Sequence, residues 1–221
     1  MRVGTDGVLV GAWARGEGCL TMLDVGTGCG LIALMLAQRF PTAQITGIEI
    51  HSQSVLEARA NVSLSPWSER IGIVEGDFCQ HDFGRATFDL IVSNPPFHTE
   101  SLQSPQATRA MARHVGRMDP HTLLGRSRQL LTLHGRLSLI VPAQAEEKWV
   151  AAGREAGLRP GRLTRVFGRI GKPYRRALIE FVMADGGEEG QCPVRQLYIT
   201  DNQGQYTEEY QALTRAFYLN M

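Results

Sequence analysis

The chain has few of the features that mark disulfide-bonded, metal-binding or membrane proteins. Its four cysteines, Cys19, Cys29, Cys79 and Cys192, are scattered and form no CxxC pair, and no histidines stand at metal-ligand spacing. We therefore expect reduced, mostly buried thiols and no bound metal. No apolar run is long enough to span a bilayer, and the chain opens without a charged-then-apolar leader. This pattern predicts a cytoplasmic protein without a membrane partner.

An excess of charge of one sign is also missing. Lys and Arg number 23 and Asp and Glu 22, so the formal net charge is +1. Such a balance argues against nucleic-acid binding through bulk charge. Basic residues nevertheless gather between 154 and 176, where only Glu155 interrupts them. Two interpretations stay open: a basic edge beside a catalytic cleft, or a set of solvated turns and strand faces.

The order of apolar patterns predicts an α/β fold. The length of 221 residues suits one domain, residues 1–221. From Cys19 onward apolar runs alternate with helical patterns, which is typical of a doubly wound, Rossmann-like, mainly parallel sheet. We predict seven strands, the last antiparallel, and a short extra strand in the tail. The expected strands cover residues 20–25, 44–50, 71–75, 88–93, 136–141, 163–167, 177–183 and, in the tail, 197–200. The expected helices begin at Gly30 and Ser52 and cover 105–113, 119–131, 143–156 and 208–218.

A glycine-rich turn, Asp24-Val25-Gly26-Thr27-Gly28-Cys29-Gly30, follows the first predicted strand. Glycines at this place let the backbone approach a nucleotide cofactor at the carboxyl edge of the sheet. The spacing GxGxG, with an acid at the strand end, differs from the GxGxxG of dinucleotide sites and favours S-adenosylmethionine over NAD. We expect the cofactor turn to consist of Asp24, Gly26, Thr27, Gly28 and Gly30. Asp24 would orient the turn or meet the charged amino-acid end of the cofactor.

Further polar residues end the next strands. Glu49 closes the second strand, about twenty residues after the glycines, where a carboxylate can accept both ribose hydroxyls. Asp77 follows the third strand, and two roles are open to it: accepting from the adenine amino group, or capping a helix. Phe78 would pack against the adenine ring. The combination at four consecutive strand ends is more specific than any of these residues alone.

The segment Asn94-Pro95-Pro96-Phe97 follows the fourth predicted strand. Each proline fixes its own backbone angle and restricts the residue before it, so the segment is stiff. The Asn94 side-chain oxygen and the Pro95 carbonyl form two acceptors for one amino group. Two acceptors on the hydrogens of an exocyclic amine favour the transition state in which charge develops on nitrogen. With Phe97 stacked on the planar group, Asn94, Pro95, Pro96 and Phe97 are predicted to catalyse direct in-line methyl transfer to a planar amine.

These motifs resemble those of class I S-adenosylmethionine-dependent methyltransferases of the amino-methylating kind, whose motif is (Asn/Asp/Ser)-Pro-Pro-(aromatic). More narrowly, the chain resembles the bacterial methyltransferases that make N6-methyladenosine beside the anticodon of valine tRNA. The resemblance extends over almost the whole chain, through Val3-Gly4-Thr5-Asp6-Gly7, Gly11-Ala12-Trp13, Ser65-Pro66-Trp67, Ala112-Arg113-His114, Lys172-Pro173, Tyr206-Thr207-Glu208-Glu209-Tyr210 and Phe217-Tyr218-Leu219. It implies that S-adenosylmethionine is bound by Gly26, Gly28, Glu49 and Asp77, with Thr5 and Asp6 near its methionine end. It also implies that Asn94 and Pro95 hold the target amine.

The chain departs from this family at two places. It begins almost at Val3, whereas the relatives carry an upstream, aromatic-rich segment, so we expect part of the lid over the cofactor to be missing. His98 follows Phe97, whereas the tRNA enzymes more often have tyrosine at position 97. The run Asn-Pro-Pro-Phe-His is typical of guanine N2 methyltransferases that act on ribosomal RNA. The target base therefore stays open at this point.

Several functions and contacts remain to be distinguished. A release-factor glutamine N5-methyltransferase uses the same chemistry but usually carries an extra helical N-terminal domain, and a DNA adenine methyltransferase usually needs a target-recognition insertion. A non-catalytic RNA-binding or cofactor-binding module would keep only the fold. For tRNA, the target base must be splayed out of the anticodon loop. We expect a monomer whose RNA-phosphate contacts come from Arg109, Arg113, His114, Arg165, Arg169, Lys172 and Arg175.

Overall fold

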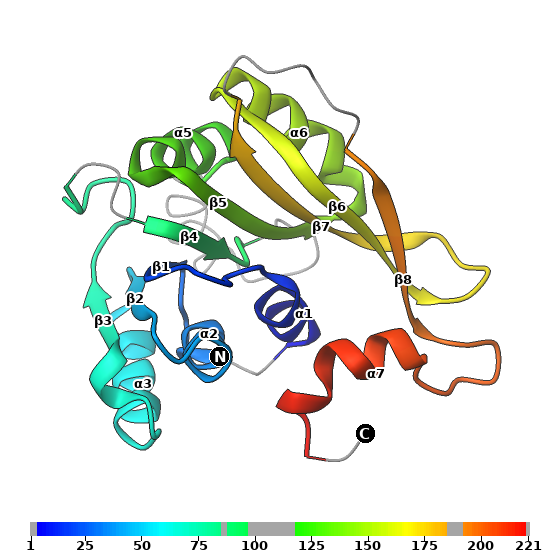
Figure 1. Ribbon diagram of the computed structural model, residues 1–221, viewed down its shortest axis with the longest axis horizontal. Coiled ribbons are helices and arrows are strands. Elements are labelled where there is room, and N and C mark those ends of the chain that lie inside the picture. The colour runs from blue at the N-terminus through cyan, green and yellow to red at the C-terminus, as the bar shows by residue number, and fades with distance from the viewer. Residues whose placement is uncertain (1–3, 85–87, 97–117, 185–191, 220–221) are drawn as a thin grey trace, which may run out of the picture.

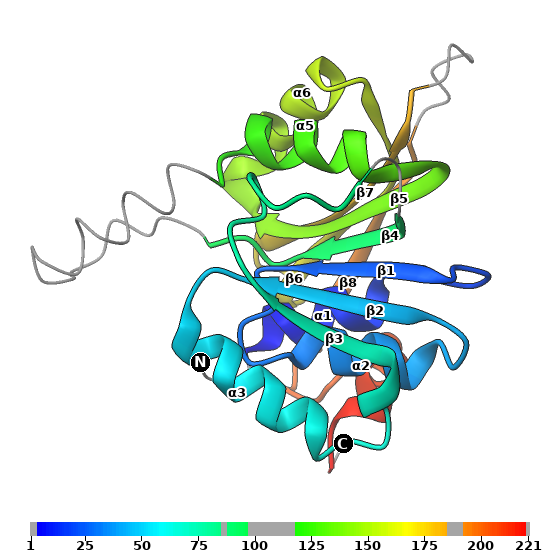
Figure 2. The same ribbon diagram turned by 90° about the vertical axis from the view of Figure 1, so that its left-hand side faces the viewer.

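The computed structural model describes residues 4–84, 88–96, 118–184 and 192–219, and these form three layers. One sheet is covered by helices α5 and α6 on one face and by α1, α2, α3 and α7 on the other (Figures 1 and 2). The predicted α/β, doubly wound architecture is confirmed. The predicted helix at 105–113 lies outside the described residues.

The described helices are α1 (Thr5–Trp13), α2 (Leu31–Arg39), α3 (Ser52–Ser63), α5 (Pro120–Leu130), α6 (Glu146–Glu155) and α7 (Glu208–Thr214). Short 3₁₀ turns are found at Ser68–Arg70, Ala143–Ala145 and Arg215–Phe217. The strands are β1 (Thr21–Val25), β2 (Gln44–Glu49), β3 (Ile71–Glu75), β4 (Phe88–Ser93), β5 (Leu131–Pro142), β6 (Leu158–Arg169), β7 (Tyr174–Met183) and β8 (Val194–Thr200).

Among the described residues the sheet has eight strands in the order β3-β2-β1-β4-β5-β7-β6-β8, because the predicted extra strand of the tail, β8, joins the seven predicted strands. The antiparallel strand is β7, the seventh predicted strand, which pairs with β5 and β6, so this prediction is confirmed. Strand β8 pairs in parallel with β6 and forms the edge of the sheet. The reason is that β6 and β7 form a hairpin, which reverses the chain and leaves the outer side of β6 open to β8. Leu197 in β8 is buried in the core, on the face of the sheet that α7 covers.

The core consists of apolar side chains on both faces of the sheet. The central strands read as nearly continuous apolar runs, such as Leu90-Ile91-Val92, because helices cover both of their faces. Val92 packs in the cluster with α1, α2 and α7, whereas Ile91 packs in the cluster with α5 and α6. Both faces of the central strands are therefore buried, and the predicted motifs begin where these strands end.

Helix α1 was not predicted. Every residue from Gly7 to Trp13 is buried, so the segment has no polar face and lacks the apolar periodicity of a surface helix. Glycine is also a weak helix former. Here Gly11 has a packing role, because a Cβ at this position would lie 2.9 Å from the Sδ atom of Met35 in α2. The two helices approach one another closely for that reason.

The other differences concern element ends and chain-wide features. Strands β5, β6 and β8 begin earlier than predicted, since pairing with neighbouring strands extends them beyond their apolar centres. Among the described residues, none of the helices combines the length and the apolar character that a bilayer span requires. The same residues contain no group of three or more His, Cys, Asp or Glu side chains placed to hold a metal ion. The four cysteines, all of them within the described residues, form no disulfide bond.

Candidate active site

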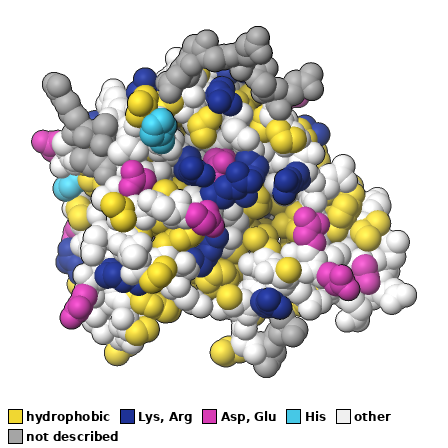
Figure 3. Space-filling view, in the orientation of Figure 1, with side chains coloured by type: hydrophobic (Ala, Val, Ile, Leu, Met, Phe, Trp, Pro, Cys, Tyr) yellow, Lys and Arg dark blue, Asp and Glu magenta, His cyan; other side chains and the backbone are white. Residues whose placement is uncertain are grey.

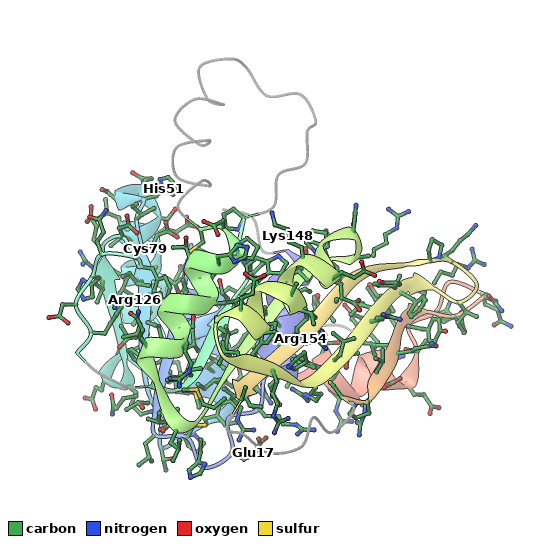
Figure 4. All side chains as sticks on the ribbon, turned by 90° about the horizontal axis from the view of Figure 1, so that it is seen from above. Glu17, His51, Cys79, Arg126, Lys148 and Arg154 are labelled. Atoms are coloured by element: carbon green, nitrogen blue, oxygen red, sulfur yellow. The ribbon has the colours of Figure 1, made fainter. Side chains whose placement is uncertain are left out.

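Four strand ends that carry predicted site residues lie side by side at one edge of the sheet. The register pairs Glu49 with Glu75, and it pairs Val25 both with Ile48 and with Ser93. The segments after β3, β2, β1 and β4 therefore follow one another across three strand spacings, roughly 14 Å. Figure 4 shows His51, just after β2, and Cys79, after β3, along this edge, with Glu17 at the opposite edge. The strand order reverses between β1 and β4, where open α/β sheets bind their ligands.

The glycine turn after β1 has a backbone that only glycine adopts easily. Gly26, Gly28 and Gly30 have φ values of 71°, 58° and 86°. The amides of Gly26 and Thr27 donate to the carbonyl oxygen of Ile48 at 2.9 and 3.0 Å, which joins the turn to the end of β2. Apart from its chain neighbours, no atom of the described residues lies within 4 Å of the position that a Cβ of Gly26 would take. The turn thus leaves open space beside its backbone, as the approach of a cofactor requires.

Asp24 stabilises the glycine turn through hydrogen bonds to its buried side chain. Its side chain is fully buried, and Oδ2 accepts hydrogen bonds from Thr27 Oγ1 at 2.6 Å and from the amide of Ala33 in α2 at 3.1 Å. Burial raises the pKa of this carboxyl group to about 7, against the hydrogen bonds from Thr27 and Ala33 that lower it. Its other oxygen, Oδ1, is buried and has no partner among the described residues. The predicted turn-orienting role is therefore visible, and an acceptor remains for a cationic group.

Glu49 is fixed by three backbone amides. Oε2 accepts from Gly28 at 3.0 Å, and Oε1 accepts from Ile50 at 2.9 Å and from His51 at 3.0 Å. The side chain is only 6% exposed. These bonds link Glu49 directly to the glycine turn and fix the orientation of its carboxylate, whose remaining lone pairs suit hydroxyl donors. The sequence did not reveal this amide contact, because Gly28 and Glu49 are brought together only by the pairing of β1 with β2.

Asp77 and Phe78 follow β3. Oδ1 of Asp77 accepts from the amide of Cys79 at 2.9 Å, so Asp77 stabilises the turn that follows β3, and no helix begins there among the described residues. The Phe78 side chain is 2% exposed and packs in the core, with its ring centroid 6.3 Å from that of Phe83. The adenine contacts of both residues remain predictions. In this arrangement the ring of Phe78 already belongs to the core.

The Asn-Pro-Pro segment begins directly beside the glycine turn. Ser93, the last residue of β4, is buried, and its Oγ donates to the carbonyl oxygen of Val25 at 2.9 Å. Asn94 is half-buried, Pro95 is buried and Pro96 is exposed. The predicted target-amine acceptors, Asn94 and Pro95, thus lie one strand from the glycine turn. Four predicted residues lie outside the described residues: Phe97, Arg109, Arg113 and His114.

The start of α1 lies near the same edge. A Cβ on Gly7 would be 3.2 Å from Leu31, the first residue of α2 after the glycine turn. Asp6 accepts from Nε of Arg176 at 2.8 Å, which ties α1 to β7. Thr5 and Asp6 are therefore close to the turn, as the resemblance implied, although their cofactor contacts remain untested. The partner of Asp6 is 170 residues away in the chain, and no local pattern points to it.

The basic residues of the β6–β7 hairpin that are predicted to contact RNA differ in their exposure and in whether an acidic side chain already binds them. Arg165 is bound by Glu146 through three hydrogen bonds, the shortest 2.7 Å, so its charge is already matched within the fold. Arg169 is exposed and donates to the backbone carbonyl of Asn202. Lys172 and Arg175 are exposed at the hairpin end. Of these residues, Arg165 is therefore the weakest candidate for an RNA contact.

Comparison with known proteins places the chain in a family. The methyltransferase small domain family model matches residues 16–147. The tRNA1(Val) (adenine(37)-N6)-methyltransferase of Phocaeicola vulgatus is 41% identical over 221 residues, which cover 100% of this chain and 92% of that protein. The enzyme of the same name from Porphyromonas gingivalis is 43% identical over 226 residues, covering 99% and 89% of the two chains. The chain belongs to the tRNA1(Val) (adenine(37)-N6)-methyltransferase family.

Solved structures agree on the fold of this family member. A protein described as a predicted O-methyltransferase from Agrobacterium tumefaciens superposes with a TM-score of 0.75 at 20% identity, covering 96% of both chains. A TehB-like SAM-dependent methyltransferase from Corynebacterium glutamicum gives a TM-score of 0.54 at 19% identity, covering 82% of this chain and 89% of that one. At these identities the likeness shows the fold alone.

The family membership makes this chain a methyltransferase whose cofactor is S-adenosylmethionine. The described residues fit that cofactor. The open space at Gly26, the fixed carboxylate of Glu49 and the unpartnered Oδ1 of Asp24 provide room, hydroxyl acceptors and an acceptor for a cationic group. The run Asn-Pro-Pro-Phe-His does not separate the chain from the adenine-N6 family, since relatives of that name match it over nearly its whole length.

Proposed function

We propose that this protein transfers a methyl group from S-adenosylmethionine to N6 of adenosine 37, next to the anticodon, of tRNA1(Val). The observation that carries the proposal is the pairing of Val25 with Ser93, which sets Asn94 and Pro95 directly beside the glycine turn. Relatives of this name, about 40% identical over the whole chain, support the choice of substrate. The enzyme acts as a single-domain monomer in the cytoplasm, where its tRNA substrate is found.

The residues of the site have separate tasks in this reaction. S-adenosylmethionine would supply a methyl group on a sulfonium: the amine nitrogen would form the N–C bond as the S–C bond breaks, S-adenosylhomocysteine would leave, and the proton lost from the nitrogen would pass to water. The Asn94 side-chain oxygen and the Pro95 carbonyl accept the two hydrogens of the adenine amino group and stabilise the positive charge that develops on its nitrogen. Glu49 would orient the ribose of the cofactor by accepting hydrogen bonds from the ribose hydroxyls. Asp24 holds the turn, and its buried Oδ1, which has no partner among the described residues, would accept a hydrogen bond from the charged amino-acid end of the cofactor.

The experiment measures transfer of a labelled methyl group from S-adenosylmethionine to total tRNA that lacks this modification, followed by nucleoside analysis. We expect N6-methyladenosine from the parent protein. Asn94→Leu, which removes the acceptor at similar volume, should lower kcat by about 10² to 10³ and change the affinity for S-adenosylmethionine by less than about twofold. Asn94→Asp is the matched control, because it keeps an acceptor oxygen, and it should retain more activity than Asn94→Leu.

Other outcomes would move the function elsewhere. Label on a guanine of ribosomal RNA would favour the guanine N2 alternative, and label on a release factor would favour glutamine N5 methylation. Binding of S-adenosylmethionine without transfer to any RNA or protein would identify a non-catalytic module on the same fold.

A further inference from the structure

An aromatic row crosses the outer part of the sheet. Phe167 in β6 stacks on Tyr198 in β8, with ring centroids 4.7 Å apart and planes at 26°. On its other side, the ring of Phe167 lies 5.9 Å from that of Tyr174 in β7. All three side chains are half-buried. Three neighbouring strands thus present aromatic rings at one level of the sheet.

Phe167 and Tyr198 lie beyond the part of the sheet that α5 and α6 cover, whereas Tyr174 contacts Arg165 and Glu146 at the start of α6. The pairing of β5 with β7 ends at Pro142 and Arg176, whereas Tyr174 and Phe167 pair further along the hairpin. The hairpin and β8 extend away from α5 and α6 (Figure 1). The helix that packs on β8 is α7, which covers its opposite face, where Leu197 is buried. Tyr198 is in the last strand of the sheet, and the row of rings ends there; the segment Tyr206-Thr207 is bonded to the backbone of β8, where Thr207 Oγ1 donates to the Tyr198 carbonyl oxygen.

Basic side chains surround the row. Arg169, Lys172 and Arg175 are exposed at the end of the hairpin. Arg175 is the extra residue of a bulge, because Val166 pairs with Arg176 and Phe167 with Tyr174, and bulges re-aim side chains.

Acidic side chains also lie near the row. Glu146 is bound by Arg165, Oδ1 of Asp201 accepts from the amides of Gln203 and Gln205, and Glu147 is exposed near Tyr174. At the hairpin end the local surface combines aromatic rings with three exposed basic side chains.

We propose that Tyr198, backed by Phe167, stacks one unpaired base of the RNA substrate outside the catalytic pocket, while Arg169, Lys172 and Arg175 contact the adjoining phosphates. Bases of single-stranded RNA stack on aromatic side chains of a sheet in this way, and arginine and lysine neutralise the backbone beside them. This inference rests on the proposed tRNA function. It adds to that function a contact with a second nucleotide.

The stacked base is not the one that receives the methyl group. Strand β6 lies three positions from β4, roughly 14 Å across the sheet. Phe167 also lies four residues, roughly 13 Å, beyond Leu163, the residue level with Ser93 through β5 and β7. A base on Tyr198 therefore sets the position of the RNA relative to Asn94 without entering the reaction. Its loss should affect binding and not the chemical step.

The test measures binding and methylation of unmodified tRNA by the full chain at several salt concentrations. Tyr198→Leu, which keeps an apolar side chain but removes the ring, should raise Kd and KM for tRNA about tenfold, the loss of one base–aromatic stack. We expect kcat and the affinity for S-adenosylmethionine to change by less than about twofold. Tyr198→Phe is the matched control and should behave like the parent, because it keeps the ring.

The salt dependence separates stacking from charge. Tyr198→Leu should leave the slope of log Kd against log salt unchanged, whereas Lys172→Ala should lower it by about one. Equal tRNA affinity of Tyr198→Leu and the parent would overturn the proposal. So would a loss accompanied by a lower melting temperature and weaker cofactor binding, or a parent dimer that Tyr198→Leu converts to monomers. If the parent binds tRNA but methylates another RNA, the proposed substrate fails, and the same comparison with that RNA still tests Tyr198.

Discussion

The Ser93 hydroxyl donates a hydrogen bond of 2.9 Å to the Val25 carbonyl, and both residues are buried. Val25 is the last residue before the glycine turn, and Ser93 is the last before Asn94. One hydrogen bond therefore joins the ends of the two strands from which the glycine turn and the Asn-Pro-Pro segment begin. We expect the spacing between methyl donor and target amine to depend on this junction.

Replacing Ser93 tests this dependence. Ser93→Ala removes the donor and leaves the buried carbonyl of Val25 with one hydrogen bond fewer, which should lower the free energy of unfolding by about 1 kcal/mol. Because Asn94 is displaced relative to the turn, we expect a lower kcat with nearly unchanged affinity for S-adenosylmethionine. Urea unfolding, calorimetric titration of the cofactor and tRNA methylation kinetics measure the three quantities. An unchanged kcat would show that the junction does not control alignment.

Glu49→Gln should weaken binding of S-adenosylmethionine. Both oxygens of Glu49 accept from backbone amides, so the NH₂ group of glutamine would face a donor on one side or the other. We expect at least a tenfold loss of cofactor affinity, the size of one lost charge-assisted hydrogen bond. Glu75→Gln is the matched control, since Glu75 pairs with Glu49 in the register but is exposed. Equal losses in the two variants would contradict a specific role for Glu49.

Asp24 should make stability depend on pH. Its pKa rises from 3.8 to about 7 because the carboxyl group is buried. The folded state therefore binds more protons than the unfolded state between these values, and the free energy of unfolding falls as pH rises from about 4 to about 7. The fall amounts to a few kcal/mol, at about 1.4 kcal/mol per pKa unit.

Asp24→Asn isolates this contribution. The amide cannot ionise, and its oxygen can still accept from Thr27 and Ala33. We expect the variant to lack that part of the pH dependence when urea unfolding is measured between pH 4 and 8 without cofactor. Parallel pH profiles for parent and variant would mean that Asp24 does not titrate in this range.

We expect Arg162 and Glu180 to stabilise the fold through their interaction with each other, so removing one partner should cost more than replacing both. Their charged atoms lie 3.3 Å apart, and the side chains are 12% and 4% exposed. The guanidinium also lies 3.5 Å from the centroid of the Trp13 ring and donates to the Trp13 carbonyl at 2.7 Å, which fastens the end of α1 to β6. Burial lowers the pKa of Arg162 to about 10; Glu180 opposes this shift. In the orientation of Figure 1, Lys and Arg side chains gather near the middle of the molecular surface (Figure 3).

Arg162→Met leaves the buried Glu180 without its partner and should cost about 3–5 kcal/mol of unfolding free energy. The double variant Arg162→Met with Glu180→Gln should recover part of this loss, because no buried charge then remains unpaired. Urea unfolding of the two single variants and the double variant gives the coupling energy. A double variant no more stable than Arg162→Met would show that the cost comes from lost packing on Trp13.

Much of the candidate site was predictable because its parts are local in the sequence. Each motif follows an apolar run, and parallel strands place their carboxyl ends at the same edge of the sheet. Four predicted site residues each end or follow a predicted strand: Gly26, Glu49, Asp77 and Asn94. The sequence is therefore enough to expect them at one edge of the sheet. The boundaries of β3 and β4 were predicted correctly, and those of β1 and β2 to within one residue.

The remaining features depend on residues that are distant in the chain. Helix α1 is buried on all sides, so its sequence lacks the periodicity that would identify it. The amides that fix Glu49, the contact of Asp6 with Arg176 and the stacking of Phe167 on Tyr198 arise only when separate strands and helices pack.

The sequence by itself determined the fold class, the glycine turn and the stiff Asn-Pro-Pro segment, since these follow from local backbone preferences and apolar periodicity. Only the tertiary structure decided that β8 pairs beside β6, that Ser93 joins the two motifs, and that Tyr198 ends an aromatic row near exposed basic residues. The physical reason is that strand order, register and cross-strand contacts are set by the packing of the whole sheet, and no short segment contains that information.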